Sequence, residues 1–114
     1  MPEFSSPFTV LKNDRKLTHP ELIRAIRFMI AAEFEAIQLY MQTAESTDNR
    51  LAREVLEDVA NEEREHVGEF LRLLRELDPE EQGYYDEGEE EVEEMIEKLK
   101  KSGKLKKAAS GKKR

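Results

Sequence analysis

The 114-residue sequence contains no cysteine, which excludes disulfides, thiolate metal sites and cysteine nucleophiles. Aromatic residues are also scarce, at 7%, whereas charged residues reach 39%, so much of the chain must be surface or solvated tail. The first 18 residues lack the apolar run of roughly 7–15 residues that a signal peptide needs. No segment approaches the roughly 20 apolar residues of a membrane span. We therefore expect one soluble, cytoplasmic domain without a membrane partner.

Opposite charges separate near the C-terminus. Residues 79–97 hold ten acids and no base, and residues 98–114 hold nine bases and no acid. This pattern predicts an acidic helix face followed by a solvated basic tail. Nucleic-acid contact, a targeting segment and a linker to a further domain are the alternative roles of the tail. Since no aromatic side chain is interleaved with its lysines, nucleic acid is not an expected partner.

Two long helical patterns occupy the middle of the chain. A capping box at residues 18–21, Thr-His-Pro-Glu, marks the start of the first pattern, which runs to the turn formers at residues 46–49. The second pattern runs from about residue 49 to Leu77. It ends before Pro79, because proline disfavours the α conformation in the residue that precedes it. The two patterns predict an antiparallel helical hairpin.

The rest of the chain adds one shorter helix. We expect a loop at residues 80–88, which contain two glycines, and a helix at residues 89–101. No segment alternates with period two, so no strand is predicted. The predicted fold is all-α, with two long antiparallel helices and a short C-terminal helix. Its expected divisions are an N-terminal arm at 1–18, a helical domain at 19–102 and a basic tail at 103–114.

Three polar residues interrupt the apolar stripes of the hairpin. Glu33 falls on the stripe of the first helix, and Glu63 and His66 fall on that of the second, three residues apart. An isolated carboxylate in a core costs several kcal/mol unless it is paired or binds a metal. The stripes are Leu22, Ile26, Met29, Glu33, Ala36, Tyr40 and Ala44, and Leu56, Val59, Glu63, His66, Phe70, Leu73 or Leu74, and Leu77.

The turn brings these residues to one level. Glu33 and Glu63 lie at nearly equal distances from the reversal at residues 47–48, about 22–23 Å at 1.5 Å per residue. A Glu on one helix opposite Glu-x-x-His on the next is half of a carboxylate-bridged di-iron site. The chain has one copy of each element, so a second chain must supply the other half and complete a four-helix bundle by dimerisation. Two Fe²⁺ per dimer would balance four carboxylates, with Zn, Mn or Ca as substitutes.

Each residue also has a simpler interpretation. His66 alone is more often an interfacial histidine than a ligand. Glu33 alone could form a buried pair with Arg27 or Arg64. The three residues together, at equal height on facing stripes, favour a metal site.

Residues 20–77 resemble the encapsulated ferritins, a branch of the ferritin-like superfamily with two long helices and a short third one. The resemblance rests on two segments, AEFEAIQLY at residues 32–40 and NEEREH at residues 61–66. It implies that Glu33, Glu63 and His66 are iron ligands. It further implies a ferroxidase site across a two-fold dimer, an annular decamer, and packaging inside an encapsulin nanocompartment in the cytoplasm that stores the oxidised iron.

The chain departs from the family pattern at two positions and at its end. Some relatives carry an acid and a tryptophan where this chain has Ala32 and Leu39. Glu35 is retained. No Leu/Gly-containing cargo peptide is found, so the basic tail is either a divergent targeting segment or a linker to a fused shell domain.

We therefore expect a ferroxidase that uses O₂ at a di-iron site. Tyr40, two turns from Glu33, is the expected hydrogen-bond donor at the catalytic site, with an ordinary core or interface aromatic as the alternative. Glu35, Glu62 and Glu65 are a candidate acidic approach for Fe²⁺, although Glu62 and Glu65 are most simply surface charges. The rivals are a rubrerythrin-like di-iron peroxidase or oxidase, whose usual cysteine-bound iron is impossible here, and a non-catalytic helical oligomerisation module.

Overall fold

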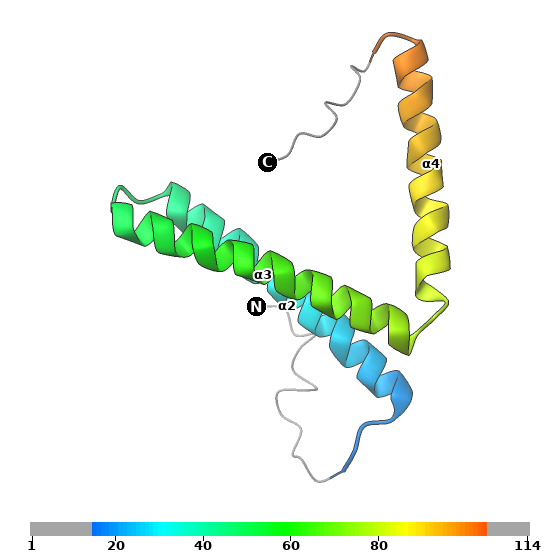
Figure 1. The fold of residues 1–114 in the computed structure, drawn as a ribbon, viewed down its shortest axis with the longest axis horizontal. Helices are drawn as coiled ribbons and strands as arrows, with labels where there is room; N and C mark the ends of the chain where they lie inside the picture. Colours follow the sequence, from blue (N-terminus) through cyan, green and yellow to red (C-terminus); the bar gives the residue numbers. More distant parts are fainter. Residues whose placement is uncertain (1–14, 105–114) are drawn as a thin grey trace. The chain divides into compact units, whose positions relative to one another are not determined.

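A computed structural model describes residues 15–104, which form three α-helices and no strand (Figure 1). Helix α2 spans His19–Glu45, α3 spans Arg50–Leu77 and α4 spans Glu81–Lys101. The chain divides between Asp78 and Pro79 into two compact units, the α2–α3 hairpin and the unit that contains α4. The predicted all-α fold is confirmed. Most of the expected arm and tail lies outside the described residues, so the domain bounds stay predictions.

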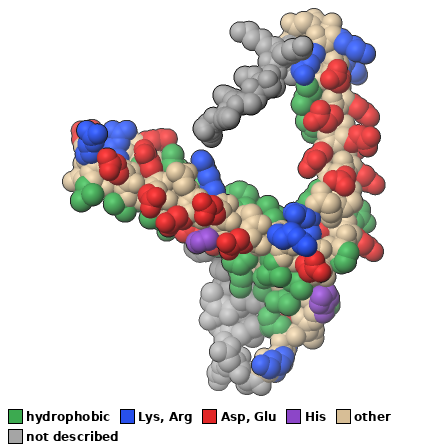
Figure 2. All heavy atoms as spheres, viewed as in Figure 1, with side chains coloured by type: hydrophobic (Ala, Val, Ile, Leu, Met, Phe, Trp, Pro, Cys, Tyr) green, Lys and Arg blue, Asp and Glu red, His purple; other side chains and the backbone are tan. Residues whose placement is uncertain are grey.

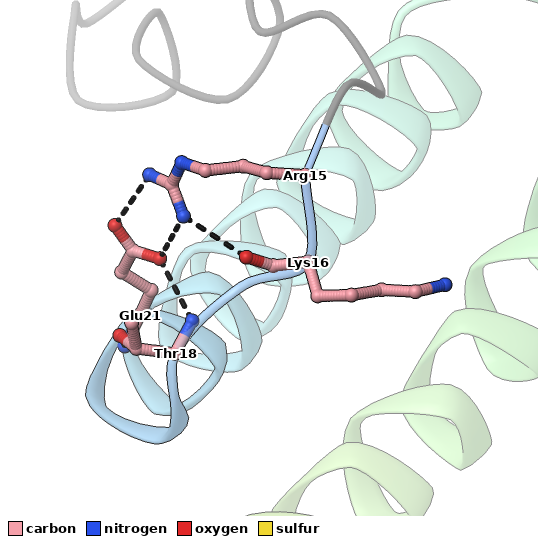
Figure 3. Close-up of polar contacts among 4 residues, drawn as sticks. All are labelled: Arg15, Lys16, Thr18 and Glu21. Atoms are coloured by element: carbon pink, nitrogen blue, oxygen red, sulfur yellow. Dashed lines mark hydrogen bonds and ion pairs between the residues drawn. The ribbon is translucent and has the colours of Figure 1, made fainter.

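Helix α2 begins at the predicted capping box. The Thr18 hydroxyl accepts from the Glu21 amide at 3.3 Å, and Glu21 Oε1 accepts from the Thr18 amide at 2.8 Å. Arg15 adds two parallel bonds to the same carboxylate, at 2.9 and 2.8 Å (Figure 3). These bonds, first from Arg15 and then from the Thr18 backbone, lower the pKa of Glu21 to about 2.

Helices α2 and α3 lie side by side and antiparallel, and the core of the hairpin lies between them (Figure 1). Its hydrophobic core cluster of buried residues is Ile26, Ile30 and Leu74. Small residues allow the helix axes to approach, since Ala44 and Ala60 are almost completely buried. The buried residues are Ala25, Ile26, Ile30, Ile37 and Ala44 on α2, and Ala60, Val67 and Leu74 on α3.

A helix cap marks the turn of the hairpin, and a hydrogen bond and an ion pair join its two helices at the open end. At the turn, the Asn49 side chain caps α3 by accepting from the Ala52 amide at 2.9 Å. At the open end, His19 Nε2 donates to the Leu77 carbonyl at 2.9 Å. There Arg27 also pairs with Asp78 at 3.6 Å. The two contacts at the open end help to fix how far along α3 each residue of α2 lies, and therefore which side chains can meet.

Helix α4 is longer than the sequence predicts. The expected loop at residues 80–88 is wrong, because the helix begins at Glu81 and continues through both glycines. A glycine inside a helix costs about 1 kcal/mol relative to alanine, which is tolerable where neighbours compensate. Gln82 donates to Asp86 at 2.7 Å and the Tyr85 hydroxyl donates to Glu81, so two side-chain bonds between residues four apart span Gly83.

The C-terminus of α4 is closed by a left-handed glycine. Gly103 has φ +78°, a conformation that favours glycine. The Lys104 amide bonds the Leu99 carbonyl at 2.9 Å and the Gly103 amide bonds that of Lys100 at 3.1 Å. This is the Schellman arrangement. None of the helices within residues 15–104 combines the length and apolar character that crossing a membrane requires.

Candidate metal centre

One glutamate of α2 and a glutamate–histidine pair of α3 converge in the middle of the hairpin. One ligand atom from each of Glu33, Glu63 and His66 lies within 4.8 Å of the other two. His66 Nδ1 is 3.1 Å from Glu63 Oε1 and 3.9 Å from Glu33 Oε2. Among the described residues, no other cluster of histidine and acidic side chains meets this criterion.

The core positions both carboxylates. Glu33 lies one helical turn from Ile30 and one from Ile37, both of which are buried. Glu63 has the same relation to Ala60 and Val67 on α3. Each carboxylate is therefore held between two packed layers of the hairpin, which limits its freedom before any ligand binds.

The cluster lies at an edge of the hairpin and not inside it. The side chains of Glu33 and Glu63 are 21% and 18% exposed, but that of His66 is 48% exposed. The expectation that all three point into the core is thus wrong for His66. The buried line of α3 passes through the next residue, Val67, and this rotation turns the imidazole towards the surface.

The three groups shift one another's pKa values. Hydrogen bonding with Glu63 raises the pKa of Glu33, and partial burial adds to the effect. Hydrogen bonds with Glu33 and His66 lower the pKa of Glu63. The bond to Glu63 also raises the pKa of His66, and the nearby charges of both carboxylates and of Glu69 contribute. A proton held among closely spaced carboxylates is what a bound cation would replace.

The remaining predicted site residues lie outside the cluster. Tyr40 is half-buried, and among residues 15–104 no hydrogen bond joins it to the three ligand candidates. Glu35, Glu62 and Glu65 are exposed. Their roles stay predictions.

The arginine alternative does not describe this site. Arg64 donates to Asn61 at 3.3 Å, and the charged neighbours that shift the pKa of Glu33 are Glu63 and His66. Sequence reasoning missed Glu69, whose charge acts on His66. Glu69 could have been identified from the sequence, because it lies three residues after His66 and residues three apart on a helix are neighbours.

The donor set fits a divalent transition metal. Two carboxylates and an imidazole supply oxygen and nitrogen ligands, which suit Fe²⁺ and also Zn²⁺ or Mn²⁺. The open side of His66 leaves room for further ligands. The cluster can therefore hold a metal ion but cannot, with three side chains, enclose two.

The helical hairpin and its carboxylate–histidine cluster define a ferritin-like protein. The sequence matches the family described as Rubrerythrin over residues 25–114, so the chain belongs to the rubrerythrin family.

Its relatives include proteins associated with encapsulin. The chain is 44% identical over 87 residues to a ferritin-like–encapsulin shell fusion protein of Pyrococcus furiosus, covering 76% of this chain but only 25% of that protein. It is 43% identical over 90 residues to the encapsulin nanocompartment cargo protein EncC of Myxococcus xanthus, covering 79% of this chain and 68% of the relative. The crystal structure of the encapsulated ferritin domain from Pyrococcus furiosus matches with a TM-score of 0.71 and 44% identity, over 76% of this chain and 89% of that one. The resemblance to encapsulated ferritins is confirmed.

Proposed function

We propose that this chain is a ferroxidase that oxidises Fe²⁺ to Fe³⁺ with O₂ at a di-iron site shared by two copies. The observation that carries the proposal is the convergence of Glu33, Glu63 and His66 within 4.8 Å at the edge of the hairpin. Membership of the rubrerythrin family and the encapsulated ferritin relatives support it.

The number of ligands is the reason for proposing that two chains share the di-iron site. A di-iron site in a helical bundle uses two glutamates and two Glu-x-x-His pairs, and one hairpin contributes half of these. A two-fold axis beside His66 would bring an identical half from the second copy. The dimer would then hold two irons among four carboxylates and two imidazoles.

Exposed apolar side chains around the cluster support the proposal that a second copy covers it. Met29 lies one turn from Glu33, and Leu73 and Val55 lie two and three turns from His66 on the same side of α3. All three apolar side chains are exposed in the single chain. Exposed apolar side chains beside a half-open polar site are typical of a protein interface.

The chain's residues would bind and place the substrate. Glu33 and Glu63 supply negative charge, one of them bridging the two metals, and His66 supplies a neutral nitrogen once its proton has left. Bound iron supplies the electrons that reduce O₂. Tyr40 is proposed as a hydrogen-bond donor that becomes engaged only when the second copy is in place.

Three exposed acids are proposed to attract iron to the site. Glu62 and Glu65 lie beside the two ligands of α3, and Glu35 lies two residues beyond Glu33. A local excess of negative charge raises the cation concentration and the association rate, and salt weakens this effect.

The test compares two neutralised glutamates. Glu33→Gln keeps the shape but removes a metal ligand, and we expect the initial rate of Fe³⁺ formation to fall by roughly 100-fold or more. Glu57→Gln, on the exposed face of α3, is the matched control and should retain the parental rate. Circular dichroism confirms that both variants keep their helices. If Glu33→Gln oxidises iron at the parental rate, the proposal fails and a helical interaction module without catalysis is favoured.

The family match keeps a peroxidase as the second candidate. A rubrerythrin-like enzyme would turn over faster with peroxide than with O₂. Iron oxidation at equal concentrations of the two oxidants decides between them, and faster consumption of O₂ favours the ferroxidase.

We further propose that the oligomer is an annular decamer inside an encapsulin nanocompartment, where the oxidised iron is stored. The compartment is supported by the two relatives, one an encapsulin cargo protein and the other a fusion to an encapsulin shell. Co-expression with a shell protein tests this, since an enclosed chain should survive a protease that digests the free chain.

A further inference from the structure

Within the described part of its own unit, residues 79–104, helix α4 carries an apolar stripe that is not buried. Val92, Met95, Ile96 and Leu99 recur at spacings of three and four residues, which places them on one face. None of the residues of α4 is buried, and Met95 is 59% exposed. Helices in proteins are held mainly by packing of such a face. We therefore expect the stripe to pack against another apolar surface.

The charges of α4 indicate what that partner is. Acidic side chains line the helix as far as Glu97 (Figure 2), and every charged residue from Lys98 to Lys104 is basic. Two copies aligned in parallel would place acid beside acid and base beside base. Two antiparallel copies would place the acidic part of each beside the basic end of the other. The helix is therefore complementary to itself.

We propose that α4 pairs with α4 of a second copy as an antiparallel two-helix coil, around a two-fold axis close to Met95. The stripe would form the seam, as the apolar positions of a coiled coil do. This contact involves no residue of the metal centre and does not depend on the proposed iron oxidation. An interface of this kind uses the same patch on both copies.

The flanks of the stripe set the register. Glu91 and Lys98, seven residues apart, lie along one flank, and Glu89 and Lys100, eleven apart, lie along the other. Both pairs are centred between residues 94 and 95. An axis at that point places Glu91 beside Lys98 of the partner subunit and Glu89 beside Lys100 of the partner subunit. Symmetry repeats each ion pair, which gives four across the coil.

Cross-linking tests the direction of the pair in the full chain. The sequence has no cysteine, so an introduced one reports alone. Met95→Cys lies at the axis and should form a disulfide-linked dimer under mild oxidation. Val92→Cys, the matched control, lies on the same stripe, but its two copies would be offset by five residues, about 7.5 Å along the axis. That offset is too long for a disulfide.

Each result decides the matter. A link through Met95→Cys and none through Val92→Cys supports the proposal. Links through both would show a parallel pair and overturn it. Links through neither would show that α4 packs on another surface, such as the hairpin of a second copy, and would also overturn it.

A charge exchange tests the register. In the Met95→Cys background, Glu91→Lys or Lys98→Glu alone would bring like charges together and slow cross-linking by roughly fivefold. The double variant Glu91→Lys/Lys98→Glu restores opposite charges and should recover the rate. If the double variant remains as slow as the single variants, the register is wrong. Iron oxidation by the same variants, measured in parallel, reports separately on the proposed function.

Discussion

Two carboxylates held close together are the unusual feature at the scale of single residues. Glu33 and Glu63 are partly buried on facing helices, and the pKa of one is raised while that of the other is lowered. Two like charges this close repel, so the pair retains a proton where isolated glutamates would not. A divalent cation relieves the same repulsion. The geometry that disfavours two free carboxylates therefore favours a metal.

Metal binding should release protons and weaken as the pH falls. The pKa of His66 and that of Glu33 are both raised, so each group is protonated over a wider pH range and a metal must displace the proton. We expect the affinity for Zn²⁺, a redox-inert probe, to drop progressively below neutral pH. Calorimetry at pH 6.5 in two buffers of different ionisation enthalpy counts the protons released.

The matched variant for this measurement is His66→Gln, which removes the titrating imidazole and should bind metal more weakly with fewer protons released. An equal heat of binding in both buffers for the parental chain would mean that no proton leaves, and it would contradict the shared-proton description of the cluster.

The sequence predicted that Glu33, Glu63 and His66 lie close together. Once the turn of a hairpin is located, the rise per residue gives the distance of each residue from the turn, and residues at equal distances on the two helices face each other. The sequence did not allow the exposure of His66 to be foreseen. Residues three and four apart cover a wide arc of the helix surface, and only the packing decides which side of that arc faces the neighbouring helix. Whether the three residues bind metal stays a prediction.

At the scale of the helices, capping chemistry predicted boundaries better than composition did. Thr18 and Glu21 form the expected box, and α3 ends at Leu77 before Pro79 as expected. The error was at α4, where two glycines suggested a loop. Glycine weakens a helix without ending it, and two bonds between side chains four residues apart span the first of these glycines, Gly83.

The start of α2 should be sensitive to acid. The pKa of Glu21 is lowered to about 2, so its contribution to stability is complete above the unfolded pKa of about 4.5 and is lost as the pH falls towards 2. Glu21→Gln keeps an acceptor for the Thr18 amide but loses the ion pair with Arg15. We expect its melting temperature to lie below that of the parental chain at pH 7 and to equal it near pH 2.

Circular dichroism at several pH values measures this difference. Glu21→Ala, which loses the capping bond as well as the charge, is the comparison and should melt lowest at pH 7. A gap between the parental chain and Glu21→Gln that is the same at pH 7 and pH 2 would show that the ion pair with Arg15 does not stabilise the helix.

At the scale of the whole molecule, the two proposed contacts would act together. The hairpin edge around His66 and the stripe of α4 are different patches, and each would pair with itself around its own two-fold axis. A chain with two such contacts alternates them along an assembly, which closes only with an even number of chains. A decamer satisfies this condition, whereas a ring with an odd number of copies would leave one patch of each kind uncovered.

Sharing the metal centre between chains links iron binding to association. If two copies complete the site, iron binds the dimer more tightly than the single chain, and iron must strengthen dimerisation by the same factor. An anaerobic Fe²⁺ titration should therefore give about one iron per chain, two per dimer, with an apparent affinity that rises with protein concentration. Sedimentation under the same conditions should show the dimer population growing as iron is added.

Glu33→Gln should abolish this effect of iron while leaving the cross-link through Met95→Cys intact, because the two contacts are separate. An iron affinity that is the same at every protein concentration would mean that the three ligands of one chain suffice, and the shared site would be wrong even if oxidation occurred.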